Sequence, residues 1–183
     1  MTEITPLAIP GPLLITPKRH GDERGFFSET YSRPALAAAG FDWAFVQDNQ
    51  SRTEKRGTLR GLHFQRPPRA QDKLVRVTRG SVFDVAVDIR RGSPTFGRWV
   101  GEELSADNWR QLLVPSGFAH GFLTLTDDCE VLYKVTDIYA PEWEDGLAFD
   151  DPDVGVAWPI EPAEIITNAR DGGWPKLARI EPF

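Results

Sequence analysis

Apolar and polar residues alternate along several short stretches of the chain, a pattern typical of strands. In residues 81–89, four apolar residues beginning with Phe83 occupy every second position, and Asp84 begins the set on the opposite face. The same period predicts further strands at residues 45–51, 73–78, 111–114, 121–125 and 130–135. Turn signals such as Gly80 separate them. The pattern therefore predicts an all-β sandwich or barrel.

Helix signals are few. The clearest lies at residues 32–40, where Ser32 is placed to cap a helix, Pro34 falls in its first turn and Gly40 ends it. From Ala140 onward, proline, tryptophan and acidic residues predict an irregular segment with a short helix. We expect its packing to depend on Trp143, Trp158 and Trp174. Because there is neither a repeat nor a linker, residues 1–183 are expected to form one domain.

Composition limits the classes of function. The net charge of −6 argues against a general nucleic-acid partner, and no apolar stretch is long enough to span a membrane. The N-terminus lacks the basic and apolar regions of a signal peptide. The one cysteine, Cys129, excludes an intramolecular disulfide and a cysteine metal cage, and it is interpreted as a small buried hydrophobe. We therefore expect a cytoplasmic protein.

Positive charge is concentrated in one part of this acidic chain. The basic residues are Arg66, Arg69, Lys73, Arg76 and Arg79. For any one of them, a solvated strand face is the preferred interpretation. Together they leave room for a small anionic ligand. Lys73 differs from the others because it shares strand parity with Val75 and Val77, where an ammonium without a partner is costly.

Two of the three histidines lie in suggestive surroundings. His20 is expected at the surface, whereas His63 and His120 each follow a glycine-containing turn. Residues 115–120 resemble the second motif of the cupin barrels, Pro-x-Gly-x-x-His. The metal-ligating positions of the first cupin motif fall on His63, Gln65 and Lys73. Since an ammonium has no lone pair and repels a cation, we expect neither a metal nor another cofactor.

Over nearly its whole length the chain is similar to the dTDP-4-dehydrorhamnose 3,5-epimerase family. The matching stretches are residues 22–27, 47–51, 59–65, 71–77, 80–87, 93–97, 115–122 and 133–159. The resemblance implies a cupin (jelly-roll) β-barrel with a few short helices, and a homodimer. It implies a dTDP-linked 4-keto-6-deoxysugar substrate, epimerised at C3 and C5 in dTDP-L-rhamnose synthesis.

The resemblance also assigns residues to roles. His63 would be the base, with Asp171 as its carboxylate partner, Lys73 would stabilise the enolate oxygen, and Tyr133 would be the acid. The residues expected to bind the substrate are Arg24, Phe26, Glu29, Gln47, Asn49, Arg60, His120, Tyr139, Glu144 and Arg170. Of these, Arg24, Arg60 and His120 are expected at the diphosphate.

Alternatives remain at three points. Asp171 precedes two glycines, as a plain turn residue also does, and Tyr133 has the strand parity of a core residue. Strict alternation puts Arg60 and His63 on opposite faces unless Gly61 marks a β-bulge. At the level of function, two rivals stay open. One is a single-centre epimerase of the same fold acting on another deoxysugar, and the other is a sugar-binding cupin without catalysis.

Overall fold

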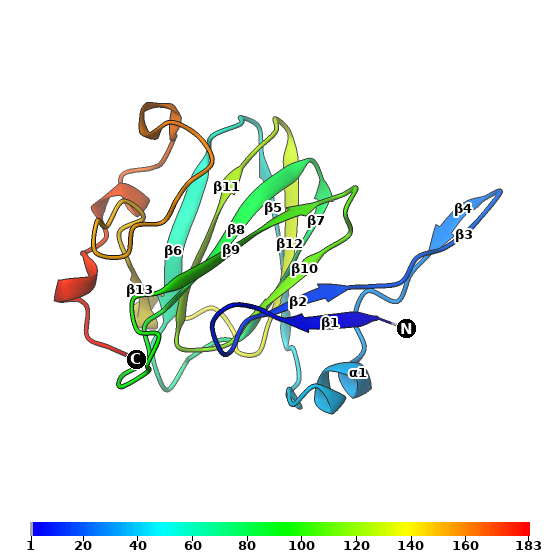
Figure 1. The fold of residues 1–183 in the computed structure, drawn as a ribbon, viewed down its shortest axis with the longest axis horizontal. Helices are drawn as coiled ribbons and strands as arrows, with labels where there is room; N and C mark the ends of the chain where they lie inside the picture. The colour runs from blue at the N-terminus through cyan, green and yellow to red at the C-terminus, as the bar shows by residue number, and fades with distance from the viewer. Residues whose placement is uncertain (1) are drawn as a thin grey trace.

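The computed structural model describes residues 2–183, in which two antiparallel sheets face each other as a jelly-roll barrel (Figure 1). The six-stranded sheet has the order β1 (Glu3–Pro6), β2 (Leu13–Thr16), β10 (Gln111–Val114), β7 (Lys73–Arg79), β12 (Cys129–Val135), β5 (Gln47–Thr53). The five-stranded sheet has the order β13 (Glu144–Gly146), β6 (Leu59–Gln65), β11 (Phe118–Thr124), β8 (Ser81–Asp88), β9 (Trp99–Ser105). The predicted all-β fold is confirmed.

All six strands predicted from alternation are present, and two of them begin more than one residue away from the predicted start. β11 begins at Phe118, three residues earlier than predicted, because its ladder to β8 already starts with the pair Phe118 and Asp88. β5 begins at Gln47 instead of Phe45. The Phe45 ring lies edge-on to Tyr31 at 5.3 Å between ring centroids. These shifts follow from tertiary packing that a local period does not contain.

Both faces of β8 are buried, and this determines where its acidic residues lie. Val85 and Val87 pack against the C-terminal segment, whereas Val82 and Ala86 face the interior between the sheets. Asp84 and its neighbours of the same parity therefore lie on the inner side. Antiparallel strands that are covered on both sides lose the simple pattern of an apolar inner face and a polar outer face.

Asp88, at the end of β8, is fully buried and belongs to a structural cluster. Its carboxylate accepts hydrogen bonds from Arg90, Ser93 and Thr95. Burial alone would raise the pKa of Asp88, but these hydrogen bonds outweigh it and lower the pKa to about 2. This carboxylate holds the loop that follows β8 and has no part in the cavity described below.

The predicted helix is α1 (Arg33–Ala38), and its Leu36 packs on the outer face of the six-stranded sheet. Ser32 stands at the N-cap as predicted, but its hydroxyl makes no capping hydrogen bond. The C-terminal part is irregular as predicted, and its 3-10 turns are η1 (Pro141–Trp143), η2 (Pro162–Glu164), η3 (Asp171–Gly173) and η4 (Leu177–Arg179). It lies along the five-stranded sheet (Figure 1).

The three tryptophans of this segment do not contribute equally to its packing. Trp158 packs into the cluster behind β8 and donates from its indole N–H to the Phe149 carbonyl. Trp174 lies against Gly146 and meets the His63 ring edge-on. The prediction for Trp143 was wrong, since this side chain is 38% exposed on a turn that has no buried residue.

A two-stranded hairpin projects away from the barrel (Figure 1). It consists of β3 (His20–Asp22) and β4 (Gly25–Phe27), and it leaves Phe26 57% and Phe27 72% exposed. His20 is exposed, as predicted. No helix among residues 2–183 is long and apolar enough to cross a membrane.

The basic residues between positions 66 and 79 do not form one patch. Each of three arginines is paired with an aspartate: Arg66 with Asp145, Arg69 with Asp137, and Arg79 with Asp128. Lys73 points into the barrel, whereas Arg76 lies on the outer side of the sheet. A single anion site made of all five is therefore not formed.

Candidate active site

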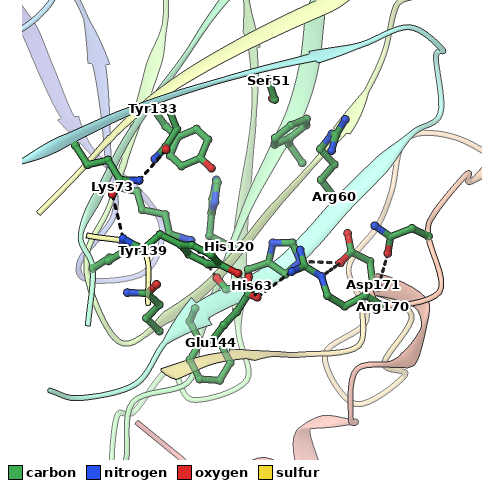
Figure 2. A pocket seen from close by; sticks show the side chains of 17 residues that line it. Ser51, Arg60, His63, Lys73, His120, Tyr133, Tyr139, Glu144, Arg170 and Asp171 are labelled. Carbon is green, nitrogen blue, oxygen red and sulfur yellow. Dashed lines mark hydrogen bonds and ion pairs between the residues drawn. The ribbon is translucent and has the colours of Figure 1, made fainter. Parts of the chain in front are cut away.

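A cavity of about 380 Å³ lies between the two sheets (Figure 2). Strands β5, β7 and β12 of one sheet contribute to its wall, as do β6, β11 and β13 of the other, together with residues 168–171. Most of the predicted site residues line this cavity, and three do not. Those that line it are Gln47, Asn49, Arg60, His63, Lys73, His120, Tyr133, Tyr139, Glu144, Arg170 and Asp171. Residues distant in the sequence thus meet at one site.

His63, on β6, is hydrogen-bonded to Asp171 at the start of η3, with 2.8 Å between Nε2 and Oδ1 (Figure 2). The other carboxylate oxygen accepts the backbone N–H of Gly61 at 3.2 Å. Burial alone would raise the pKa of Asp171, but these bonds hold it below its ordinary value. Asp171 does begin a turn, as the alternative interpretation held, and its carboxylate orients the His63 imidazole.

A β-bulge at Gly61 brings Arg60 and His63 to the same cavity. On β11, Phe122 pairs with Arg60 and His120 pairs with His63, so β6 uses three steps where β11 uses two. The backbone of Gly61 has φ +139°, and a Cβ there would lie 2.6 Å from the Gly121 Cα. Glycine is required by both the conformation and the close approach.

Replacing Gly61 with alanine is expected to lower turnover on the order of 100-fold, because the bulge sets the positions of Arg60, His63 and the Asp171 carboxylate together. The control is Gly40→Ala, where φ is +94° but the space around the new Cβ is open. Turnover and thermal unfolding are measured for both. Wild-type turnover in a folded Gly61→Ala variant would contradict this account of the bulge.

Lys73 is buried, and its ammonium Nζ donates to the His63 carbonyl oxygen at 3.2 Å. Burial lowers the pKa of Lys73 to about 8, against the attraction of Asp84 and Glu144. An ammonium carries three donors. Two of them stay available to a ligand in the cavity.

The rate should depend on pH through Lys73. Its ammonium is charged below pH 8 and loses its proton as the pH rises through about 8, so kcat/KM is expected to fall above that pH. Lys73→Arg is the comparison, because a guanidinium stays charged and should remove the alkaline decline, whatever its effect on the rate. A wild-type profile that stays flat to pH 10 would contradict a role for the ammonium.

His120 was expected to contact the diphosphate, and the structure gives it a different partner. The side chain is 8% exposed, and its Nε2 lies 2.6 Å from Oδ1 of Asp84, which is fully buried. Burial lowers the pKa of His120, Asp84 opposes this, and the charge of Lys73 adds to the lowering. The ring still lines the cavity, so a contact between His120 and the substrate stays a prediction.

Tyr133 projects into the cavity from β12, on the sheet opposite His63 (Figure 2). Its ring also packs against the core, so both interpretations of its parity hold in part. Burial raises the pKa of its phenol. The hydroxyl therefore keeps its proton at neutral pH and has no hydrogen-bond partner within residues 2–183.

The rim of the cavity is a polar network. Glu144 accepts hydrogen bonds from the Tyr139 hydroxyl at 3.0 Å and from Arg170 at 2.8 Å. Gln47 also serves this rim, since its side-chain oxygen accepts the backbone N–H of Tyr139 and its amide donates to Asn49. Tyr139 itself lines the cavity and is half exposed.

Three predicted substrate-binding residues lie outside the cavity of this chain. Arg24 is exposed on the projecting hairpin and pairs with Asp22. Phe26 meets the Trp109 ring edge-on at 4.9 Å between centroids, and Glu29 lines a small recess near α1. Within one chain, these three residues are not brought to the site.

Several lining residues were missed by the sequence analysis. Asn168 accepts the backbone N–H of Asp171 and so helps to set the pair with His63. Gln71 donates to the Asp137 carbonyl, which fixes the loop carrying Tyr139. Ser51 also lines the cavity, and the sequence does carry a signal for it, since Ser51 has the same strand parity as Gln47 and Asn49.

A family model described as dTDP-4-dehydrorhamnose 3,5-epimerase matches residues 6–179. The chain belongs to this epimerase family. A dTDP-4-dehydrorhamnose 3,5-epimerase from Pseudomonas aeruginosa is 54% identical over 165 residues, which is 90% of each chain. One from Escherichia coli is 51% identical over 160 residues, covering 87% of this chain and 85% of the relative.

Solved structures of epimerases superpose closely on the chain. A dTDP-6-deoxy-D-glucose-3,5-epimerase from Legionella pneumophila in complex with dTDP-4-keto-L-rhamnose gives a TM-score of 0.94 at 44% identity, covering 99% of this chain and 95% of that one. A 3'-monoepimerase from Streptomyces bikiniensis in complex with dTDP-quinovose gives 0.88 at 37% identity, covering 95% and 87%. The predicted family and jelly-roll fold are confirmed. Because a 3'-monoepimerase has the same fold, the fold by itself does not determine whether one or two centres are inverted.

The residues of this family member do not fit the metal site of other cupins. Gln65 donates to the carbonyls of Arg69 and Ile138 and accepts the Ala140 N–H, so its amide is occupied. His63 and His120 each bind an aspartate through Nε2. Within residues 2–183, no three His, Cys, Asp or Glu side chains are grouped to hold an ion.

Dialysis against a chelator is therefore expected to leave turnover unchanged, because the ammonium of Lys73 occupies the position of a metal-binding carboxylate. Elemental analysis before and after dialysis accompanies the assay. A stoichiometric transition metal whose removal abolishes turnover, and whose return restores it, would contradict the expectation.

Proposed function

We propose that this enzyme epimerises C3 and C5 of dTDP-4-keto-6-deoxy-D-glucose, the step that leads to dTDP-L-rhamnose. The observation that carries the proposal is the opposition of His63 and Tyr133, which enter one cavity from different sheets. A sugar ring bound between the sheets has an imidazole on one face and a phenol on the other. Inversion of a stereocentre requires proton removal on one face and delivery on the opposite face.

His63 is the proposed base. The carbons that flank the C4 ketone carry acidified C–H bonds, because the negative charge left on deprotonation spreads to the oxygen as an enolate. The hydrogen bond from Nε2 to Asp171 orients the ring, leaves Nδ1 as the acceptor and stabilises the imidazolium once it has formed. Asp171 thus acts through His63 and does not itself remove the proton.

Lys73 is the proposed partner of the enolate oxygen. Its ammonium is held in the cavity wall by the His63 carbonyl and keeps two N–H groups for the C4 oxygen. A fixed positive charge in a buried site stabilises an oxyanion more strongly than water does. Tyr133, whose phenol stays protonated at neutral pH, then supplies the proton on the other ring face.

The nucleotide diphosphate requires cations. Among the arginines that line the cavity, Arg60 is bound only to the neutral oxygens of Thr53 and Arg52, whereas Arg170 is paired with Glu144. Arg60 is therefore the proposed diphosphate ligand, with its planar guanidinium suited to two parallel bonds. Tyr139, half exposed at the entrance, is placed for stacking on the base.

We further propose a homodimer in which the projecting hairpin of one copy reaches the other. Arg24 and Phe26 are exposed and face no part of their own cavity. An exposed arginine next to an exposed aromatic ring on a two-stranded arm is suited to an anionic nucleotide on a second copy. A cytoplasmic location is also proposed, since the thiol of the buried Cys129 is free.

Two rivals are tested by one product analysis. The relatives named as 3,5-epimerases are 54% and 51% identical to this chain, and the 3'-monoepimerase is 37% identical, which favours two centres. The purified protein is incubated with the keto sugar nucleotide, and a 4-keto reductase traps the product. L-Rhamnose supports the proposal. A sugar inverted at one carbon identifies the single-centre rival, and unchanged substrate identifies a binding protein.

A further inference from the structure

Asp84 lies beside the cavity without lining it, and it has no role in the proton transfers proposed above. It stands on β8, opposite His120 on β11, and its Oδ1 lies 2.6 Å from the His120 Nε2. The Asp84 side chain is fully buried. This pair resembles that of His63 and Asp171, but it is the deeper of the two, since the His120 side chain is 8% exposed and that of His63 is 22% exposed.

The second oxygen of Asp84 has no partner. Oδ2 is buried and receives no hydrogen bond within residues 2–183. A buried carboxylate is costly unless charge or hydrogen bonds offset it. His120 offers one hydrogen bond, and burial lowers the pKa of its ring, so the ring adds no full charge to offset a charged Asp84.

Lys73 is the complementary case. It is a buried ammonium whose only hydrogen bond runs to a backbone carbonyl, and no carboxylate among the described residues lies within ion-pair distance. Asp84 is the largest favourable influence on its charge, and Glu144 is the second. The His63 carbonyl that holds the Lys73 ammonium stands opposite His120 in the β6–β11 ladder, and His120 in turn binds Asp84. Two opposite buried groups, each without a direct ion pair, thus flank the same pair of histidines.

The other charged groups around this cluster are already engaged. Glu144 on β13 is bound by Arg170 and Tyr139. Glu102 on β9, directly opposite Asp84 in the ladder, is paired with Arg110 at 3.6 Å. His63 on β6 binds Asp171, and Tyr133 on β12 is protonated. Of the two carboxylates that favour the charge of Lys73, Asp84 and Glu144, only Asp84 has no arginine partner.

We propose that Asp84 is a positioning residue of the epimerase, which fixes the His120 ring in the cavity wall and supplies the buried negative charge that keeps the Lys73 ammonium protonated. The catalytic role of Asp84 rests on the proposed function, because a charged Lys73 is needed to stabilise the enolate. The charge relation itself is a property of the folded protein. It is therefore measured without substrate.

The test is the NMR titration of Lys73, followed at its side-chain Cε and assigned with Lys73→Arg. In the wild type the midpoint is expected at about pH 8. Asp84→Asn keeps the shape of the side chain and removes the charge, so the midpoint should fall by about 1 pH unit or more. The alkaline decline of kcat/KM should move with it, while dTDP affinity stays unchanged. Equal midpoints in the variant and the wild type would overturn the proposal.

Asp88→Asn is the matched control. Asp88 lies on the same strand, is equally buried, and is bound by Arg90. The variant should unfold at a lower temperature and leave the Lys73 midpoint where it was. An equal shift in both variants would mean that the effect comes from loosening β8, and it too would overturn the proposal.

A second measurement uses the wild type alone and covers the case in which Asp84→Asn does not fold. Nitrogen NMR of His120, assigned with His120→Gln, should show a proton held on Nε2 from pH 6 to 9, as donation to Asp84 requires. An Nε2 without a proton would show that His120 does not donate to Asp84, and it would overturn the proposal. Because neither titration uses substrate, failure of the proposed reaction in the product analysis stays distinct from failure of this inference.

Discussion

Replacing His63 with alanine is expected to abolish solvent deuterium incorporation at every carbon of the substrate. The imidazole is the more exposed of the two cavity histidines that a carboxylate positions, with 2.8 Å between its Nε2 and the Asp171 Oδ1. Loss of a general base costs on the order of 10²–10⁴-fold in rate. Affinity for dTDP should stay near the wild-type value, because the proposed ligands of the nucleotide are Arg60 and Tyr139, and the substitution leaves both side chains in place.

Asp171→Asn provides the graded comparison for His63→Ala. The amide keeps the shape of the carboxylate but stabilises the imidazolium less, so the loss should be smaller than for His63→Ala. Thermal unfolding and dTDP binding verify that both variants are folded. Deuterium exchange by His63→Ala at the wild-type rate would reduce His63 to a structural residue.

Tyr133→Phe is expected to separate exchange from inversion. The variant keeps the ring and its packing against the core and deletes only the hydroxyl. His63 and Lys73 still form the enolate, which then recovers a proton from the His63 side or from water. Substrate should bind normally and still exchange deuterium, while inversion falls much more than exchange does.

Tyr31→Phe is the matched control for Tyr133→Phe. Tyr31 packs on the outer side of the six-stranded sheet, against Phe45, and does not line the cavity. A phenol that only satisfies a structural hydrogen bond loses about 1 kcal/mol of stability as phenylalanine and leaves the rate intact. Equal losses of exchange and inversion in Tyr133→Phe, or no loss of either, would remove Tyr133 as the acid.

Much of the fold was predictable because a two-residue period maps directly onto a pleated strand. The pattern at residues 73–78 and 111–114 matches β7 and β10 closely. The same period did not reveal which face of a strand is inward once both are covered. On β8 the face carrying Val85 packs under the C-terminal segment, and the face carrying Asp84 turns into the barrel, which depends on a segment far along the chain.

The site was predictable where a residue conflicts with its surroundings. Lys73 stands out as an ammonium at an apolar parity, and the structure buries it in the cavity wall. The bulge at Gly61 remained one of two options, because it depends on the approach of Gly121 from another strand. The projection of the hairpin carrying Arg24 is likewise a tertiary fact that no local pattern of charge or hydropathy contains.

The most direct measurement of the central claim is an NMR time course of dTDP-4-keto-6-deoxy-D-glucose with the purified enzyme in deuterated water. Proton removal next to the ketone by His63, with return of a solvent-derived proton, must label each carbon that is inverted. The proton signals at both C3 and C5 are expected to disappear as deuterium enters at both carbons. Deuterium at one carbon alone, or at neither, would contradict epimerisation at two centres.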